Sequence, residues 1–400
     1  MFAGLDEIDW DQLVHAYGEA SDVPNDIRAL VGSNEKAAKD ALWRLFGNIY
    51  HQGTRYTATV PAIPYLVEAA VALEPVRAAA VLGLLSAIAE PAADRIYDDQ
   101  MTIEAFRIDA LEEEQALSEE ELAERKKFGC PPTIESDVYD AVITQIPRLI
   151  SELNISNRDV QIGLFELLGN SPQHSDDVKN IAEKALSSSK DDELLQVAIV
   201  ECLSRLHRSV EVEYLGPVFE ELSNIGSSPF LRAHIALAKS DIGDARVDEL
   251  LNALGQAEKL YEIDRQSERG KGWTVSHIAN ALKPWAATEK NHVCEALMRS
   301  LPAARKWEAD TSVVVDAIVF NLAYPEPTKN FFAKKLAKDL TSLERTALKY
   351  IIEFGSWKVG NNWSGNFTAQ VASYGLPDMP NDLRRYLSAE KKPLTRWLKR

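Results

Sequence analysis

The sequence predicts an all-α protein built as a HEAT-like α-solenoid, which is a stack of helical hairpins. Apolar residues recur at helical spacing along most of the chain, and alternating strand-like runs are almost absent. Three stripes also align with one another at offsets of 35 and 36 residues: QIGLFELLGN from Gln161, QVAIVECLSR from Gln196 and RAHIALAKSD from Arg232. A second stripe separates the copies, at 178–187 and 212–223. A hairpin of this length cannot bury its own apolar face, so we expect the hairpins to stack.

Each helix is expected where apolar residues return every three or four positions. In the stripe from Gln161, for example, Ile162, Phe165 and Leu168 share one helical face. Asp176 and Asp177 come just before the next stripe, where carboxylates favour a helix N-terminus. Besides that stripe, we predict helices at 42–50, 61–73, 77–89, 138–153, 178–187, 193–206, 212–223, 229–239, 246–254, 274–283, 291–300, 311–322, 331–340 and 343–354.

Composition bounds the class of protein. The 400 residues suggest two or three domains or one elongated repeat array. A net charge of −17 disfavours a broad grip on nucleic acid, which needs a basic face. The sequence contains no apolar run long enough for a membrane helix and begins with no secretory signal. The three cysteines, Cys130, Cys202 and Cys294, form no disulfide or zinc pattern, so we expect a reduced, cytoplasmic protein in which Cys202 and Cys294 pack in the core.

Residues 94–137 form an acidic segment that we interpret as an insertion between hairpins. It holds 14 acidic and 5 basic residues and is expected to be partly helical over 102–127. Three readings remain open: a solvated helical face, a docking surface for a basic partner, or a catalytic carboxylate pair. The candidate partner-binding residues of this segment are Glu112, Glu113, Glu114, Glu119, Glu120 and Glu121.

The C-terminal segment, 355–400, is expected to cap the array. Its glycine- and asparagine-rich stretch carries Trp357, Trp363, Phe367 and Tyr374, which either plug the end of the solenoid or form an exposed patch. Trp363 is therefore a candidate partner-binding residue. The last ten residues, KKPLTRWLKR, carry five positive charges. We thus divide the chain into N-terminal hairpins (1–93), the acidic insertion (94–137), a repeat array (138–354) and the cap with its basic tail (355–400).

Two loops supply the remaining candidate residues. His51-Gln52-Gly53-Thr54 either presents His51 and Tyr56 to a ligand or ends a helix, with Gly53 at positive φ. The loop DRQSERGKGWTVS, which contains Trp273, either contacts an anionic group or is a solvated connection between repeats. We find no phosphate-binding loop, nucleophile elbow or metal-ligand spacing in the sequence, and we predict no enzyme activity and no cofactor.

Both ends of the chain resemble a known group. LWRLFGNIYHQGTRYTATVPAIPYLVEAA (42–70) and SWKVGNNWSGNFTAQVASYGLPDM (356–379) resemble bacterial HEAT-repeat, phycobilisome-lyase-like proteins, which include immunity proteins of polymorphic toxins. The resemblance covers the middle of the chain only through its repeat periodicity. It implies a solenoid without catalytic chemistry, so it brings no catalytic residue with it.

These features predict a protein-binding solenoid, in its most specific form an immunity protein that neutralises a basic toxin domain. One alternative is a HEAT-like DNA-binding protein or DNA glycosylase, for which Asp310 near Trp307, or Glu308, could serve as the acid. The other alternative is a small-ligand or bilin-lyase-like scaffold, which would need a pocket.

Overall fold

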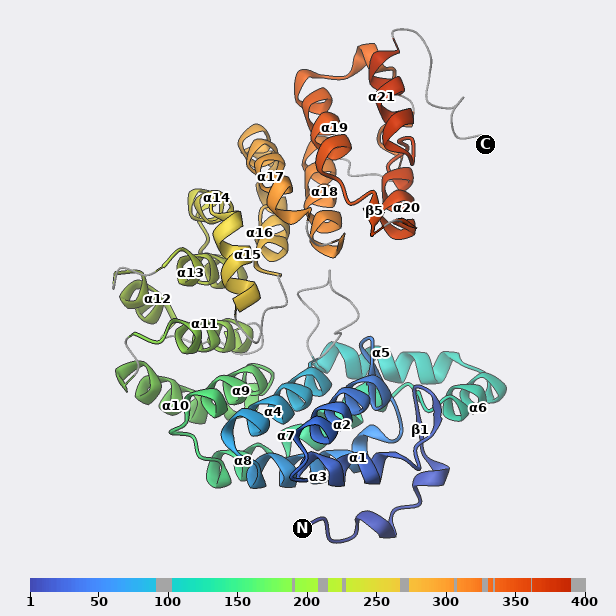
Figure 1. The fold of residues 1–400 in the computed structure, drawn as a ribbon, viewed down its shortest axis with the longest axis vertical. Coiled ribbons are helices and arrows are strands. Elements are labelled where there is room, and N and C mark those ends of the chain that lie inside the picture. The colour runs from blue at the N-terminus through green and yellow to red at the C-terminus, as the bar shows by residue number, and fades with distance from the viewer. Residues whose placement is uncertain are drawn as a thin grey trace. The chain divides into compact units, whose positions relative to one another are not determined.

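The computed structural model describes residues 1–90, 103–188, 191–207, 215–224, 228–266, 273–305, 308–325, 330–333, 335–360 and 362–389 (Figure 1). Over these residues the protein is mostly helical, at 73%, with about 20 helices that pack largely in chain order. This confirms the predicted helical class. The chain divides into two units, Met1–Gly216 and Pro217–Arg400. The finer division into four segments stays a prediction.

The first unit begins with two short 3₁₀ turns and a small hairpin, and then continues as helices. Helices α1 and α2 pack together, as do α3 and α4. The elements are β1 (Val14–His15), β2 (Gly18–Glu19), α1 (Val23–Leu30), α2 (Glu35–Asn48), β3 (Tyr50–His51), β4 (Thr54–Arg55), α3 (Thr59–Ala72), α4 (Pro75–Ala89), α5 (Ile103–Ala116), α6 (Glu119–Lys127), α7 (Ile134–Ile143), α8 (Ile146–Glu152), α9 (Arg158–Leu168), α10 (Ser175–Ser188) and α11 (Glu193–His207).

Helix α12 (Leu215–Asn224) spans the division between the units. The second unit pairs α13 with α14 and α17 with α18, and α21 closes against α19. Its elements are α13 (Pro229–Asp241), α14 (Val247–Leu254), α15 (Ala257–Gln266), α16 (Thr274–Ala281), α17 (Lys290–Ala304), α18 (Glu308–Ala323), α19 (Ser342–Phe354), β5 (Lys358–Val359), β6 (Asn362–Trp363), α20 (Gly365–Ser373) and α21 (Pro380–Ser388).

The core of the first unit is centred on α4 and α9, which come from distant parts of the chain. A Cβ atom at Gly163 in α9 would lie 3.1 Å from the carbonyl oxygen of Ala79 in α4, so glycine permits this close approach. Helix α4 also packs against α7, and α9 packs against α11. Helices α5 and α6 come between α4 and α7 in the sequence, while α4 is covered by α7 and α9. The acidic segment therefore interrupts the chain without separating the helices of the core.

Two predicted helices differ in the structure. The stripe at 138–153 is broken into α7 and α8, because Pro147 in the first turn of α8 cannot continue the hydrogen-bond ladder of a preceding helix. The stripe at 331–340 forms no α-helix in its described residues. There the backbone N–H of Phe332 donates to the carbonyl of Tyr374 (2.9 Å), so tertiary pairing replaces the helical bond.

The near-absence of strands needs a small correction. The described residues contain three antiparallel hairpins, β1–β2, β3–β4 and β5–β6, each with two residues per strand. The loop His51-Gln52-Gly53-Thr54 is the turn of β3–β4 rather than the end of a helix. Gly53 does adopt positive φ (94°), as predicted, and Gln52 does too (50°), which a tight two-residue hairpin requires.

The aromatic residues of the C-terminal segment separate into two groups. Trp357, Phe367 and Tyr374 are buried, and the Trp357 and Phe367 rings meet edge to face with centroids 5.1 Å apart. The Tyr374 hydroxyl donates to Asp316 in α18 (2.8 Å), so this segment is fastened to the helices before it. Trp363 is 49% exposed. Three of the four aromatic residues thus pack inward, and Trp363 faces solvent.

Two glycines of the second unit offer a matched test of this packing. Gly375 and Gly243 both have positive φ, 79° and 75°. A Cβ atom at Gly375 would lie 2.6 Å from the backbone nitrogen of Ala333, whereas nothing lies within 4 Å of one at Gly243. Gly243→Ala should cost about 1 kcal/mol for backbone strain. Gly375→Ala should cost about 1 to 3 kcal/mol more because of the clash.

Urea unfolding followed by circular dichroism measures both variants. Equal midpoints for Gly375→Ala and Gly243→Ala would show that the contact with Ala333 contributes nothing.

Candidate functional site

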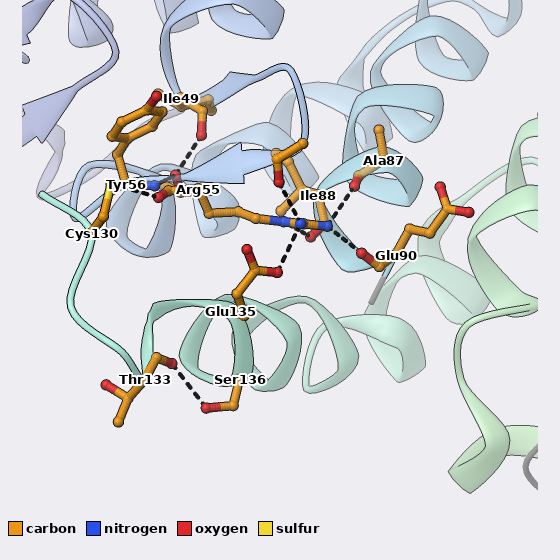
Figure 2. Close-up of polar contacts among 12 residues, drawn as sticks. Ile49, Arg55, Tyr56, Ala87, Ile88, Glu90, Cys130, Thr133, Glu135 and Ser136 are labelled. Atoms are coloured by element: carbon orange, nitrogen blue, oxygen red, sulfur yellow. Dashed lines mark hydrogen bonds and ion pairs between the residues drawn. The ribbon is translucent and has the colours of Figure 1, made fainter. Parts of the chain in front are cut away.

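A buried arginine organises the region that holds the predicted loop residues. Arg55, in β4, is 1% exposed, and its guanidinium points at the C-terminal end of α4 (Figure 2). It donates to the carbonyl oxygens of Ala87 and Ile88, both at 3.1 Å, and to that of Glu90. The last carbonyls of a helix have no partner within the helix and carry partial negative charge. Arg55 therefore caps α4 from another element.

The same guanidinium joins two further elements. It donates to Oε2 of Glu135 in the first turn of α7 (2.8 Å) and to the carbonyl of Gly53 within its own hairpin (2.6 Å). The Tyr50 ring lies 5.2 Å from the guanidinium carbon. One side chain thus holds the β3–β4 hairpin, the end of α4 and the start of α7 together. No pattern in the sequence distinguishes Arg55 from an exposed arginine, so sequence reasoning missed it.

The outer side of the hairpin carries the two loop candidates, His51 and Tyr56. The His51 Nδ1 atom lies 3.1 Å from the carbonyl oxygen of Gly47 at the end of α2, and its ring meets the Tyr17 ring at 5.4 Å. Tyr17, at the tip of β1–β2, is 70% exposed. Burial raises the pKa of Tyr56. Both candidates are therefore half-buried parts of a packed hairpin, and Tyr17 offers the larger exposed surface.

Cys130 lies beneath this hairpin. Its Sγ atom is 3.6 Å from the carbonyl oxygen of Arg55, and burial raises the pKa of the thiol.

The six candidate glutamates all lie on α5 and α6, but they differ in the interactions that they make. Glu121 accepts hydrogen bonds from Ser118 N (2.8 Å) and Oγ (2.7 Å), which lowers the pKa of Glu121 and caps the N-terminus of α6. Glu113 pairs with Arg125 and so links α5 to α6. The other four glutamates are exposed and take part in neither of these two interactions: Glu112, Glu114, Glu119 and Glu120.

Helix α6 is fastened to the hairpins at its C-terminal end. The backbone N–H of Thr57 donates to the carbonyl of Gly129 (2.8 Å). Gly129 has φ of +72° and approaches Val14 of β1 so closely that a Cβ atom would lie 2.7 Å from it. In Figure 1, β1 and α6 accordingly lie next to each other. The C-terminal end of α6 is thus held against the two N-terminal hairpins of the same unit by close contacts at Gly129.

Exposed apolar side chains accompany the acidic ones, and sequence reasoning missed them. Ile108 and Leu111 in α5 are 58% and 53% exposed, and Phe128 at the end of α6 is 60% exposed. The signal was present as an i, i+3 apolar pair inside the acidic segment, but spacing alone does not show whether another helix covers it. The described surface of α5 and α6 therefore combines negative charge with uncovered apolar groups.

Trp273 and Trp363 belong to the second unit and lie on different elements. Trp273 precedes α16 and stacks on His277, with ring centroids 6.5 Å apart. The Lys358 ammonium lies 4.9 Å from the centre of the Trp363 ring across β5–β6. Within the second unit these two residues make separate contacts. Within the first unit, His51 and Tyr56 lie at or next to the β3–β4 hairpin, and the six glutamates lie on α5 and α6.

A buried polar cluster in the second unit is a different kind of feature. Thr274 donates to Oδ1 of Asp264 (3.1 Å) and lies 3.3 Å from Nε2 of His234, while Ser276 donates to Asp310. Burial raises the pKa of Asp310 to about 6. All of these side chains are less than 10% exposed. A substrate therefore has no access to Asp310 in this conformation, which weakens its nomination as the acid of a glycosylase.

Other groups that carry chemistry give no site in the described part of the chain. The described residues include no cluster of three or more histidine, cysteine or acidic side chains that could hold a metal ion. Cys202 and Cys294 are buried, as predicted, and burial raises the pKa of each thiol to about 12. In the same residues we find no helix of sufficient length and hydrophobicity to cross a membrane.

Comparisons with protein-family models, with curated protein sequences and with solved structures yield no match for this chain. The resemblance to bacterial HEAT-repeat proteins therefore stays an expectation that rests on the motifs at the two ends.

The role of Arg55 can be tested by replacing it with methionine, which keeps much of the apolar stem. Arg55→Met removes the cap of α4 and the partner of Glu135, and breaking a buried pair costs about 3 kcal/mol or more. Urea unfolding should show this loss. Hydrogen exchange should also locate it at the end of α4 and the start of α7.

Arg148→Met is the matched control, because Arg148 is 40% exposed and pairs with Glu152 on the surface of α8. Its cost should stay below about 1 kcal/mol. Similar losses in the two variants would contradict the proposed role of Arg55.

Asp310→Asn should alter how stability depends on pH. The pKa of Asp310 is about 6 in the folded chain against an ordinary 3.8, so the folded chain binds this proton more tightly. The resulting stabilisation is complete below an ordinary aspartate pKa and is lost as the pH rises through about 6. About two pH units correspond to about 3 kcal/mol. Asp310→Asn should therefore gain up to that amount relative to the wild type between about pH 4 and about pH 7.

Urea unfolding midpoints of the wild type and of Asp310→Asn are compared across this pH range. Asp378→Asn is the control, because Asp378 is exposed. If the curves of the wild type and Asp310→Asn run parallel, the burial of Asp310 has no energetic consequence.

Proposed function

We propose that this chain is a non-catalytic, protein-binding α-solenoid of HEAT-like hairpins, and that it acts in the cytoplasm as an immunity protein that neutralises a cognate, basic bacterial toxin. The observation that carries the proposal is the pair of acidic helices, α5 and α6, which belong to the first unit but do not take part in the packing of α4 with α3, α7 and α9. Large apolar groups exposed on a surface are typical of interaction sites, and the negative charge beside them favours a basic partner.

The architecture supports a binding function. Helices of the first unit pack largely in chain order, and α9 and α11, which share the 35-residue repeat, are neighbours. Stacked hairpins of this kind expose long surfaces suited to macromolecular partners. Asp264 and Asp310 in the second unit are buried and accept hydrogen bonds from the hydroxyls of Thr274 and Ser276, which is typical of structural polar clusters.

Charge supports the choice of partner. A net charge of −17 would speed association with a basic protein and would oppose a general grip on nucleic acid. Of the acids nominated for the glycosylase alternative, Asp310 is buried, while Trp307 and the Glu308 side chain lie outside the described residues. No arrangement of the described residues favours the small-ligand alternative over protein binding.

The proposal is tested by purifying the tagged chain from its native host and identifying what remains bound at physiological salt. We expect one basic protein in stoichiometric amount. Expression of that protein alone should arrest bacterial growth, and coexpression with this chain should restore it.

An unrelated helical protein of similar size and net charge is the control, since it separates specific inhibition from charge effects. Absence of a stable partner, or a partner whose expression is harmless, would refute the immunity function.

A further inference from the structure

We propose that the outer face of α5 is the docking surface for a basic, amphipathic segment of the protein partner. This inference rests on the proposed function and adds to it where the partner binds and what chemistry it presents. The face is defined by Glu104, Ile108, Leu111, Glu112 and Gln115, which follow one another at helical spacing and are all exposed.

The two faces of α5 differ in what covers them. Arg107 flanks the outer face, one turn before Leu111, and pairs both with Glu104 and with Asp140 of α7, the helix against which α5 packs. Ile108 and Leu111 lie on the outer side with exposed fractions of 58% and 53%. Two large aliphatic side chains one helical turn apart form an anchor of the kind that a partner helix uses. The described structure leaves this anchor uncovered.

The charges around Ile108 and Leu111 indicate which kind of partner segment would bind there. Residues 103–128 hold nine acidic and four basic residues. Arg107 is engaged with Asp140 and with Glu104 of the face itself, Arg125 is engaged with Glu113, and the two lysines lie at the far end of α6. The apolar anchor is therefore set in a negative field. A partner with apolar residues on one face and lysine or arginine beside them complements both features.

The same charges disfavour a second copy of this chain as the occupant. Pairing this face with itself, as in a two-fold dimer, would bring the glutamates of both copies together. Like charges held this close oppose association.

The surface is also preorganised. The capping box between Ser118 and Glu121 fixes the start of α6, and the pair of Glu113 with Arg125 links the two helices. The contact of Thr57 with Gly129 anchors the end of α6. Binding to a surface that is already ordered loses less conformational entropy, so a modest anchor can give useful affinity.

The test measures binding of a labelled model peptide to the full chain by fluorescence anisotropy. The probe contains two copies of the heptad Leu-Lys-Lys-Leu-Leu-Lys-Leu, which forms a basic amphipathic helix. A second peptide has the same composition in an order without an apolar face. The wild type should bind the first peptide at least about fivefold more tightly, and binding should weaken as salt is raised from about 50 to about 300 mM.

Ile108→Ser/Leu111→Ser should weaken binding of the first peptide at least about tenfold. Val76→Ser/Val359→Ser is the matched control, because Val76 and Val359 are 53% and 54% exposed elsewhere on the chain. It should bind within about twofold of the wild type. Circular dichroism checks that both variants fold.

Three results would overturn the inference. The peptide binds the Ile108→Ser/Leu111→Ser variant as well as the wild type, or the two peptides bind alike, which indicates charge attraction without an anchor. Alternatively, sedimentation shows a wild-type dimer that this variant abolishes, which makes a second copy the occupant.

The cognate partner separates this inference from the proposed function. If a toxin is recovered and binds the Ile108→Ser/Leu111→Ser variant with unchanged affinity, the interface is elsewhere and the immunity function stands. If the wild type recovers no partner, the immunity function fails, and the peptide experiment still decides the chemistry of the α5 face.

Discussion

The burial of Arg55 is the constraint on which the arrangement of the first unit depends. A guanidinium cannot be deprotonated in a protein, so a buried one must find acceptors for its charge. Arg55 finds them in the carbonyls at the end of α4, in Gly53 and in the carboxylate of Glu135. Arg55 therefore ties the end of α4 to the start of α7, which lie on the two sides of the acidic helices in the sequence.

The separation between core and acidic segment has a packing cause. Gly163 lets α9 approach the backbone of α4 closely, and α7 also packs on α4. The helices that chiefly pack on α4 are therefore α3, α7 and α9, and not α5 or α6. Because the core is completed without them, α5 and α6 can keep exposed glutamates and exposed aliphatic side chains. Residues freed from core packing in this way are available for recognition.

The second unit shows how an acidic residue can suggest catalysis without supplying it. Burial raises the pKa of Asp310. The hydroxyl of Ser276 donates a hydrogen bond to the Asp310 carboxylate. A catalytic acid needs the same raised pKa but also access to a substrate. Asp310 is 3% exposed. The described contacts therefore place Asp310 in a buried cluster in which polar groups connect α15, α16 and α18.

The sequence by itself determined the helical class, the helices at the three aligned stripes that start at Gln161, Gln196 and Arg232, the positive φ of Gly53 and the helical character of the acidic segment. These follow from periodicity, capping residues and backbone preference, which act over a few neighbouring positions. Only the tertiary structure decided that Arg55 is buried, that His51 lies on a β-hairpin, that 331–340 forms no α-helix, and that nothing described covers Ile108 and Leu111. Each of these depends on residues far away in the chain: the partners of Arg55 include Ile88 and Glu135, 33 and 80 positions along. Burial is set by such distant contacts, and local spacing cannot report them.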